Sequence, residues 1–297
     1  MNRTLAIILV LIGGASYGLI SPAVKMAYDA GFSPADVTSS QYFAAMAVLV
    51  VIALFQLRHL RNLTRRDLLL LSFLGLLSTG TSVFYYLSLS YLPASLAIVL
   101  LFQFTWVVMV IDFFVARNKP TPVKWLALAL IFFGTLFAVD LLHSEWGDVS
   151  VLGLTLGFLS SLTYGAFLYF TSYVRAGSSP FLNSALISIV STFVVFLIFP
   201  PTFLWNGSLG AGLWVWALII GGLGQVIPPV LFNIGIPKIG GALAAVLGAI
   251  ELPVAVISAY LLLHEAVVGV QWIGIVLILV GIVVTELRLV RKRTQLT

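Results

Sequence analysis

A single acidic residue, Glu251, lies inside an apolar stretch, Gly240 to Leu263, that is long enough to cross a bilayer. At roughly 1.5 Å per helical residue, Glu251 is about 16 Å from the start of this stretch, near the midplane of a ~30 Å hydrocarbon layer. Intramembrane acids are costly and usually serve a function, so contact with a substrate or a proton is one interpretation. The other is structural: Pro253 leaves a backbone carbonyl free, to which a protonated carboxyl could donate.

The helical neighbours of Glu251 favour a position inside the protein rather than against lipid. One turn or two turns away on the same face are Ala244, Gly248, Ala255 and Ser258. Small residues of this kind let membrane helices approach closely. We therefore expect Glu251 to point into packed protein or into a cavity.

Two further groups of polar residues fall in apolar stretches. Gln225 follows three glycines and precedes Pro228 and Pro229, which remove adjacent backbone donors, so we expect the helix to bend or open there. Gln103 and Trp106 are three residues apart and share a helical face. Each group has packing as its alternative explanation. The full set of candidates for a substrate cavity is Tyr17, Ser78, Tyr85, Gln103, Trp106, Tyr164, Gln225 and Glu251, with helix breaks at Pro228, Pro229 and Pro253.

The sequence lacks the residues that usually form metal sites, phosphate-binding loops and catalytic clusters. The chain has no cysteine, and His59, His143 and His264 all fall between apolar stretches, so the sequence predicts no metal site and no cofactor. No glycine-rich phosphate loop is present, which argues against ATP-driven pumping by this chain. An intramembrane enzyme would need clustered acids or histidines, and a purely structural scaffold would not need a mid-membrane acid. We therefore predict that the protein is not an enzyme.

Composition defines the environment of these residues. The chain has 297 residues, of which 61% are hydrophobic and 8% charged, with a mean hydropathy of +1.14, far from the roughly 25% charged residues of a soluble domain. Apolar runs bounded by charge, Gly or Pro predict an all-α integral membrane protein with ten transmembrane helices. The expected spans are residues 4–27, 34–57, 67–91, 94–116, 122–142, 150–174, 180–200, 210–236, 240–263 and 268–289.

The basic residues predict the orientation. With ten spans, all Lys and Arg residues except Lys25 fall on the face that holds both termini. The positive-inside rule then makes both termini cytoplasmic, in a multi-pass protein of the cell inner membrane. Because topology explains the basic surplus, we expect the lipid bilayer and a small-molecule substrate as partners, and no nucleic acid. The oligomeric state stays open, with a monomer as the simplest case.

An internal repeat relates the two halves of the chain. A shift of 147 residues places Trp125 on Trp272 and Gly134 on Gly281, and the same register relates four pairs of predicted spans. We therefore predict two five-helix halves, residues 1–142 and 143–297. Five spans is an odd number, so the halves must be inverted repeats, as in alternating-access transporters with a site near mid-membrane.

The two halves close with similar segments, "YLPASLAIVLLFQF" to "FFGTLFAV" and "KIGGALAAVLGAIELP" to "LILVGIVV". This pattern resembles the EamA family of the drug/metabolite transporter superfamily over nearly the whole chain. Glu251 and Pro253 lie near the position of the family's mid-helix Glu-Pro signature, and Leu263-His264-Glu265 resembles its Gly-Glu ending. The first half departs from the family pattern, with Asn118 where an acid is usual and Gln41 where an arginine is frequent.

The resemblance implies a secondary transporter, since family members mostly export amino acids, nucleosides or other small metabolites. We predict export of amino acids, especially large hydrophobic or aromatic ones, by alternating access. The alternatives are export of drugs or other metabolites without a preference for amino acids and, less favoured, an intramembrane enzyme.

Overall fold

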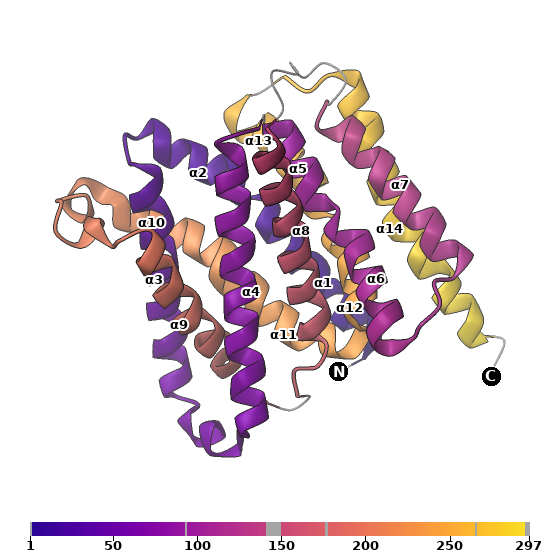
Figure 1. The fold of residues 1–297 in the computed structure, drawn as a ribbon, viewed down its shortest axis with the longest axis horizontal. Coiled ribbons are helices and arrows are strands. Elements are labelled where there is room, and N and C mark those ends of the chain that lie inside the picture. The colour runs from indigo at the N-terminus through magenta and orange to yellow at the C-terminus, as the bar shows by residue number, and fades with distance from the viewer. Residues whose placement is uncertain (1, 93, 141–149, 176–177, 265, 295–297) are drawn as a thin grey trace. The chain divides into compact units, whose positions relative to one another are not determined.

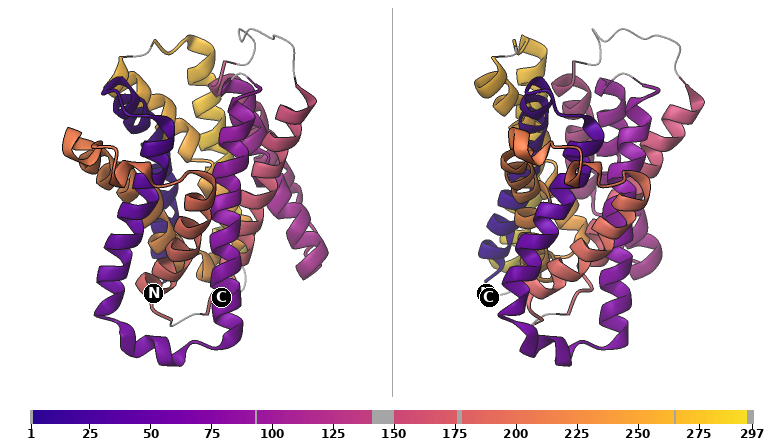
Figure 2. Two further views of the ribbon diagram at one scale, coloured as in Figure 1. Left: turned by 60° about the vertical axis from the view of Figure 1, so that its left-hand side comes forward. Right: turned by 90° about the vertical axis from the view of Figure 1, so that its left-hand side faces the viewer.

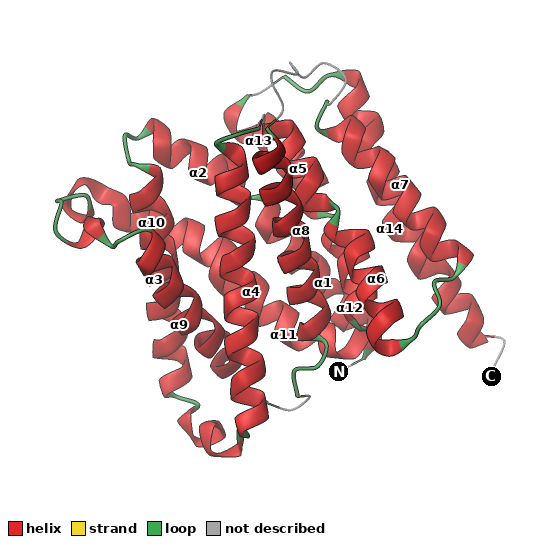
Figure 3. Cartoon of the chain, viewed as in Figure 1, coloured by secondary structure: helices red, strands yellow, loops and turns green. Residues whose placement is uncertain are grey.

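The structure is a computed structural model that describes residues 2–92, 94–140, 150–175, 178–264 and 266–294. Every regular element in these ranges is helical (Figure 3). Among the described residues, eight helices are long and apolar enough to cross a membrane, and Pro122–Ala138 and Gly269–Val284 are shorter apolar helices. The chain is therefore an all-helical multi-pass membrane protein. The predicted boundary at residues 142/143 and the motif residue Glu265 lie outside the described ranges.

The chain forms two compact units, each assembled from distant parts of the sequence. Unit 1 contains residues 1–79 and 170–239, and unit 2 contains residues 80–169 and 240–297. Each unit thus combines helices from both predicted halves of the chain. The halves themselves remain a prediction, because compactness and internal homology are different properties.

Unit 1 is built from helices of both its sequence segments. Its elements are α1 (Arg3–Gly18), α2 (Ile20–Asp29), α3 (Pro34–Leu54), η1 (Leu57–Asn62), the first part of α4 (Arg65–Leu89), the last residues of α8 (Val151–Thr171), α9 (Pro180–Ile198), η3 (Thr202–Leu204), η4 (Leu209–Leu213), α10 (Trp214–Gly221), η5 (Gly222–Val226) and α11 (Ile227–Ile239). The short 3-10 turn η1 joins α3 to α4 (Figure 2). Helix α1 packs on α11, and α3 packs on both α9 and α10.

Unit 2 holds the remaining helices. They are the rest of α4 and α8, α5 (Ala94–Phe102), α6 (Phe104–Ala116), α7 (Pro122–Ala138), α12 (Gly241–Gly248), α13 (Glu251–Leu263) and α14 (Gly269–Thr294). Helices α7 and α14 lie side by side (Figure 1) and form its most extensive helix pair. Helix α12 packs on α6.

Three helices begin with the same local signal, a Ser or Thr followed by proline. The side chains of Ser33, Thr121 and Ser179 each accept a hydrogen bond from a backbone N–H in the first turn of α3, α7 and α9. The following proline has no N–H to leave unsatisfied, and its fixed φ suits the first helical position. These boundaries are therefore fixed by the local sequence.

Glycines bring α7 and α14 into backbone contact. A Cβ at Gly134 would lie 2.9 Å from the carbonyl oxygen of Gly274, and one at Gly281 would lie 3.1 Å from that of Ala127. Contact partners thus descend along α7 as they ascend along α14, so the two helices are antiparallel. Under the shift of 147 residues, Gly134 of α7 corresponds to Gly281 of α14, and Gly274 of α14 corresponds to Ala127 of α7. The two contacts are therefore equivalent to each other under the shift.

Replacing Gly274 with alanine is expected to destabilise the protein. The new Cβ would meet the backbone nitrogen of Ala138, and would lie 2.6 Å from the carbonyl oxygen of Gly134. Backbone atoms cannot rotate away, so the helices must separate, at a cost of about 1–3 kcal/mol. The thermal unfolding midpoint in detergent, followed by size-exclusion chromatography, should fall.

Gly269→Ala is the matched control, because a Cβ at Gly269 has no neighbour within 4 Å. Its midpoint should equal that of the wild type. An unchanged midpoint for Gly274→Ala would contradict close packing of α7 on α14.

Candidate functional site

Two helices of unit 2 are interrupted at corresponding points. The first interrupted helix consists of α5 and α6, which are separated at Gln103. The second consists of α12 and α13, which are separated at Ala249 and Ile250. At both breaks a backbone N–H bonds three residues back instead of four: Gln103 to the Leu100 carbonyl (3.1 Å) and Ile250 to the Leu247 carbonyl (3.2 Å). The bounds of α6, shifted by 147 residues, coincide with those of α13.

The side chain of Gln103 stabilises the first break. Its Nε2 donates to the Val99 carbonyl at 2.7 Å, which takes the place of the backbone N–H that now bonds to Leu100. Its Oε1 accepts a hydrogen bond from Trp106 Nε1 at 2.7 Å. Trp106 in turn stacks on Phe158 of α8, with ring centroids 6.1 Å apart. Gln103 therefore uses both ends of its amide within its own helical run.

Glu251 is the first residue of α13, directly after the second break. The hydroxyl of Tyr164, which α8 places in unit 2 and which is 6% exposed, donates to Glu251 Oε2 at 3.5 Å. A carboxylate in the first turn of a helix also interacts favourably with the helix dipole. The carbonyl of Ala249, deprived by Pro253 of its usual partner, accepts instead from the Leu252 N–H at 3.4 Å.

Phe104, which our sequence analysis did not single out, completes this group. It is fully buried, its ring lies edge-on to Tyr164 with centroids 4.6 Å apart, and a Cβ at Gly248 would lie 3.7 Å from it. The repeat shift places Phe104 on Glu251, so this signal was present in the sequence. Glu251, Tyr164, Phe104 and Gly248 form what we call the Glu251 cluster.

One further candidate of unit 2, Tyr85, lies on α4, with its ring centroid 6.0 Å from that of Tyr86. One turn earlier, the hydroxyl of Thr81 donates to the hydroxyl of Thr163, next to Tyr164, at 3.1 Å. The α4–α8 contact in unit 2 is therefore polar.

The other predicted site residues belong to unit 1. Tyr17 lies against Phe232, with ring centroids 5.9 Å apart, and Ser78 is on α4. Gln225 is half-buried in the π-helical segment η5, and Pro228 and Pro229 follow in the first turn of α11. The irregular backbone thus directly precedes the two prolines, and the Ser16 hydroxyl donates to the Leu223 carbonyl within it at 2.7 Å.

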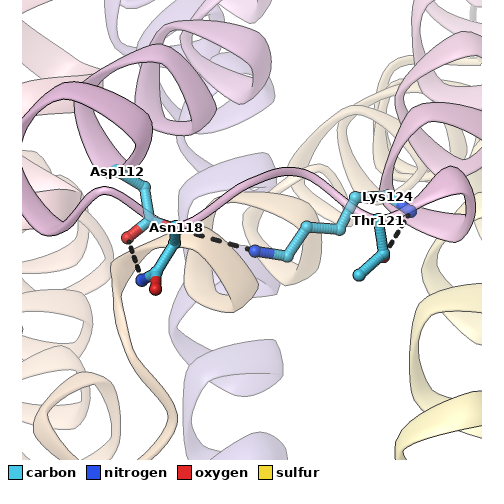
Figure 4. Close-up of polar contacts among 4 residues, drawn as sticks. All are labelled: Asp112, Asn118, Thr121 and Lys124. Carbon is cyan, nitrogen blue, oxygen red and sulfur yellow. Dashed lines mark hydrogen bonds and ion pairs between the residues drawn. The ribbon is translucent and has the colours of Figure 1, made fainter.

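A second acidic residue, Asp112, organises the turn from α6 to α7 (Figure 4). Its side chain is nearly buried, accepts a hydrogen bond from Asn118 Nδ2 at 3.0 Å and pairs with Lys124 Nζ at 3.6 Å. Arg117 ends α6 in a left-handed conformation, as His264 ends α13, and each N–H bonds to a carbonyl five residues back. Asp112 therefore orders a loop rather than a substrate site.

Among the described residues, no three His, Cys, Asp or Glu side chains are grouped so that they could hold a metal ion. The Glu251 cluster offers a different chemistry, a single carboxylate beside aromatic rings at a helix break. A carboxylate can pair with a cation, and aromatic rings can cover an apolar surface.

Long apolar helices, two runs of which are interrupted in unit 2, are the features of a multi-pass membrane protein. The chain belongs to the EamA-like transporter family, whose model matches residues 4–139 and 151–287. Membership of this family points to a membrane transporter rather than to an enzyme.

Individual proteins are also similar to this chain. "Uncharacterized transporter sll1319" of Synechocystis sp. is 27% identical over 202 residues, a match that covers 66% of this chain and 60% of that protein. A solved structure titled "Crystal structure of protein" matches with a TM-score of 0.80 and 17% identity, over 98% of this chain and 99% of the other. At that identity the structural match speaks for the fold alone.

Proposed function

We propose that this protein is a secondary transporter that exports amino acids, with a preference for large hydrophobic and aromatic ones, by alternating access. The contact between Tyr164 and Glu251 at the start of α13 carries this proposal. It combines a carboxylate for an α-ammonium group with aromatic surface for an apolar side chain. Ligand sites of transporters commonly lie at such helix breaks.

The proposed mechanism uses two inverted five-helix repeats and ten spans, formed by the eight long helices and the two shorter apolar ones. Three observations support it. The family model matches the chain twice, α6 and α13 have equivalent bounds, and the contacts between α7 and α14 exchange under the shift. Exchange of this kind is expected when a pseudo-two-fold axis relates two antiparallel helices.

The proposed ligand orientation follows from the Glu251 cluster. The α-ammonium group pairs with the carboxylate of Glu251, while the hydrophobic side chain lies against the rings near it. No Lys or Arg is present in α5, α6, α8, α12 or α13, so polyanions should bind poorly. The cluster is therefore suited to a zwitterion or a cation with apolar surface.

Competition in proteoliposomes tests the substrate class. Phenylalanine, tryptophan and leucine should each inhibit counterflow of radiolabelled phenylalanine, whereas a nucleotide sugar should not. Stronger inhibition by the nucleotide sugar would contradict the proposal. Equal inhibition by apolar amines without a carboxylate would favour the second candidate, an exporter of drugs or other metabolites with no preference for amino acids.

We further propose that the protein lies in the cell inner membrane with both termini in the cytoplasm, because the loops on that side carry all but one of the 15 Lys and Arg residues. Single cysteines at the exposed positions Asn62 and Tyr91 of this cysteine-free chain should react with an impermeant maleimide from opposite sides. Reaction of Asn62→Cys from outside intact cells would contradict the orientation.

A further inference from the structure

We propose that residues 199–213 of unit 1, which connect α9 to α10, form a strap that Asp36 latches onto the start of α3, and that release of this strap is a step of the transport cycle. The residues of the latch belong to unit 1, whereas the Glu251 cluster belongs to unit 2. Its role in the cycle rests on the proposed function, whereas the latch itself does not.

Three side chains of the strap donate hydrogen bonds to the carboxylate of Asp36. Its Oδ1 accepts from Thr202 Oγ1 at 2.9 Å, and its Oδ2 accepts from Asn206 Nδ2 at 3.0 Å and from Ser208 Oγ at 3.5 Å. Ser33, the cap of α3, donates to the same Oδ2 at 3.0 Å. Asp36 is only 7% exposed, so these bonds replace most of its hydration.

An apolar contact anchors the same strap. Phe203 is 1% exposed and packs in a core cluster with Val37, Leu213 and Ile220. Its ring centroid lies 5.8 Å from that of Phe43 on α3. The strap is thus attached near its start by the carboxylate of Asp36 and the buried ring of Phe203, and at its end by the fully buried Leu213. Lifting its first part would expose Val37.

The strap also contains residues suited to movement. Gly207 and Gly212 have φ values of 86° and 103°, and neither Cβ position has a neighbour within 4 Å. Glycine adopts such angles without strain, so rotation there meets little resistance. Trp205, which lies in the chain between the buried Phe203 and Gly207, is 68% exposed. The strap is therefore anchored at its start and at Leu213, and the two glycines with room around their Cβ positions lie between these anchors.

The repeat-equivalent position of Asp36 is Asn183, at the start of α9, and its contacts are different. Asn183 Nδ2 donates to Ser178 Oγ at 2.6 Å, while its buried Oδ1 has no hydrogen-bond partner. An amide oxygen also binds donors less strongly than a carboxylate. The two corresponding points of unit 1 are therefore held unequally, with the stronger latch at Asp36.

Labelling of a buried cysteine tests the latch. Val37→Cys, in a chain without other cysteines, places a thiol under the strap, where the native side chain is 2% exposed. We expect slow reaction with an impermeant maleimide. Adding Asp36→Asn should accelerate labelling at least tenfold, because an amide has one acceptor oxygen and turns its own N–H groups toward donors. Loss of charge-assisted bonds on this scale changes an equilibrium by about that factor.

Two companion variants make the result decisive. Thr202→Val removes a donor from the strap without altering α3, so it should accelerate labelling in the same direction but less. Asp29→Asn removes an exposed acid at the end of α2 and should leave the rate unchanged. If both Asp36→Asn and Thr202→Val label at the rate of the Val37→Cys parent, Asp36 does not latch the strap.

Transport separates the two parts of the proposal. If strap release is a step of the cycle, Asp36→Asn should change the rate of phenylalanine counterflow at least threefold, while Asp29→Asn should not. Faster labelling with an unchanged counterflow rate would overturn the role in the cycle. Should phenylalanine not be transported even by the wild type, the amino-acid proposal fails, whereas the labelling rates still decide whether the latch exists.

Discussion

Glu251→Gln is expected to reduce phenylalanine counterflow by roughly 10- to 100-fold while the protein remains folded in the membrane. Glutamine keeps the volume and accepts the hydrogen bond from Tyr164, but it cannot pair with an α-ammonium group or carry a proton. A hydrogen bond to a charged group contributes about 1.5–3 kcal/mol, which corresponds to this loss. Initial rates in proteoliposomes, normalised to reconstituted protein, measure the effect.

Tyr164→Phe is the matched variant for this prediction. It removes the hydroxyl that donates to Glu251 at 3.5 Å and keeps the ring that packs edge-on against Phe104. Because that hydrogen bond is long, we expect a loss of only about threefold. Full transport by Glu251→Gln would assign Glu251 a structural role and would remove the main support for the proposed site.

Gly248→Trp is expected to abolish transport, with a loss of more than about tenfold, whereas Gly248→Ala should stay within about twofold of the wild type. A Cβ at Gly248 meets only the Phe104 ring, at 3.7 Å, which is ordinary contact and leaves room for one methyl group. An indole would fill the space that the substrate's side chain needs beside Phe104.

The control for bulk alone is Gly269→Trp, at a position whose Cβ has no neighbour within 4 Å. It should transport normally. Size-exclusion profiles of all three variants establish that they are folded. Normal counterflow by Gly248→Trp would mean that the substrate does not pass beside Phe104 and Gly248.

Local features of the chain could be predicted because they depend on neighbouring residues. The apolar runs led to membrane helices, and the family resemblance placed the chain among transporters, as the family model establishes. The irregular backbone at η5 also has a local cause: three glycines and two adjacent prolines weaken the helical hydrogen bonds there. The corresponding part of α4 lacks the prolines, and α4 is continuous.

Partners of polar side chains were harder to predict, as Gln103 demonstrates. The sequence placed it on a face with Trp106, and the structure places its amide on the Val99 carbonyl and the Trp106 indole. A glutamine has several acceptors within reach along a membrane helix, and only the position of the break decides which one it uses. Phe104 was missed because a phenylalanine in an apolar run resembles any other packing residue, and its one signal was that the shift of 147 residues places it on Glu251.

The sequence by itself determined the membrane environment, the positions of most helices and the singular character of Glu251, because hydrophobicity, capping and proline chemistry act within a few residues. The tertiary structure alone decided that Tyr164 contacts Glu251, that Phe104 lies beside them, and that Asp36 binds a segment about 170 residues away in the chain. These contacts join residues remote in sequence. Their formation depends on which helix faces pack together, and that choice minimises the free energy of the whole assembly rather than of any single segment.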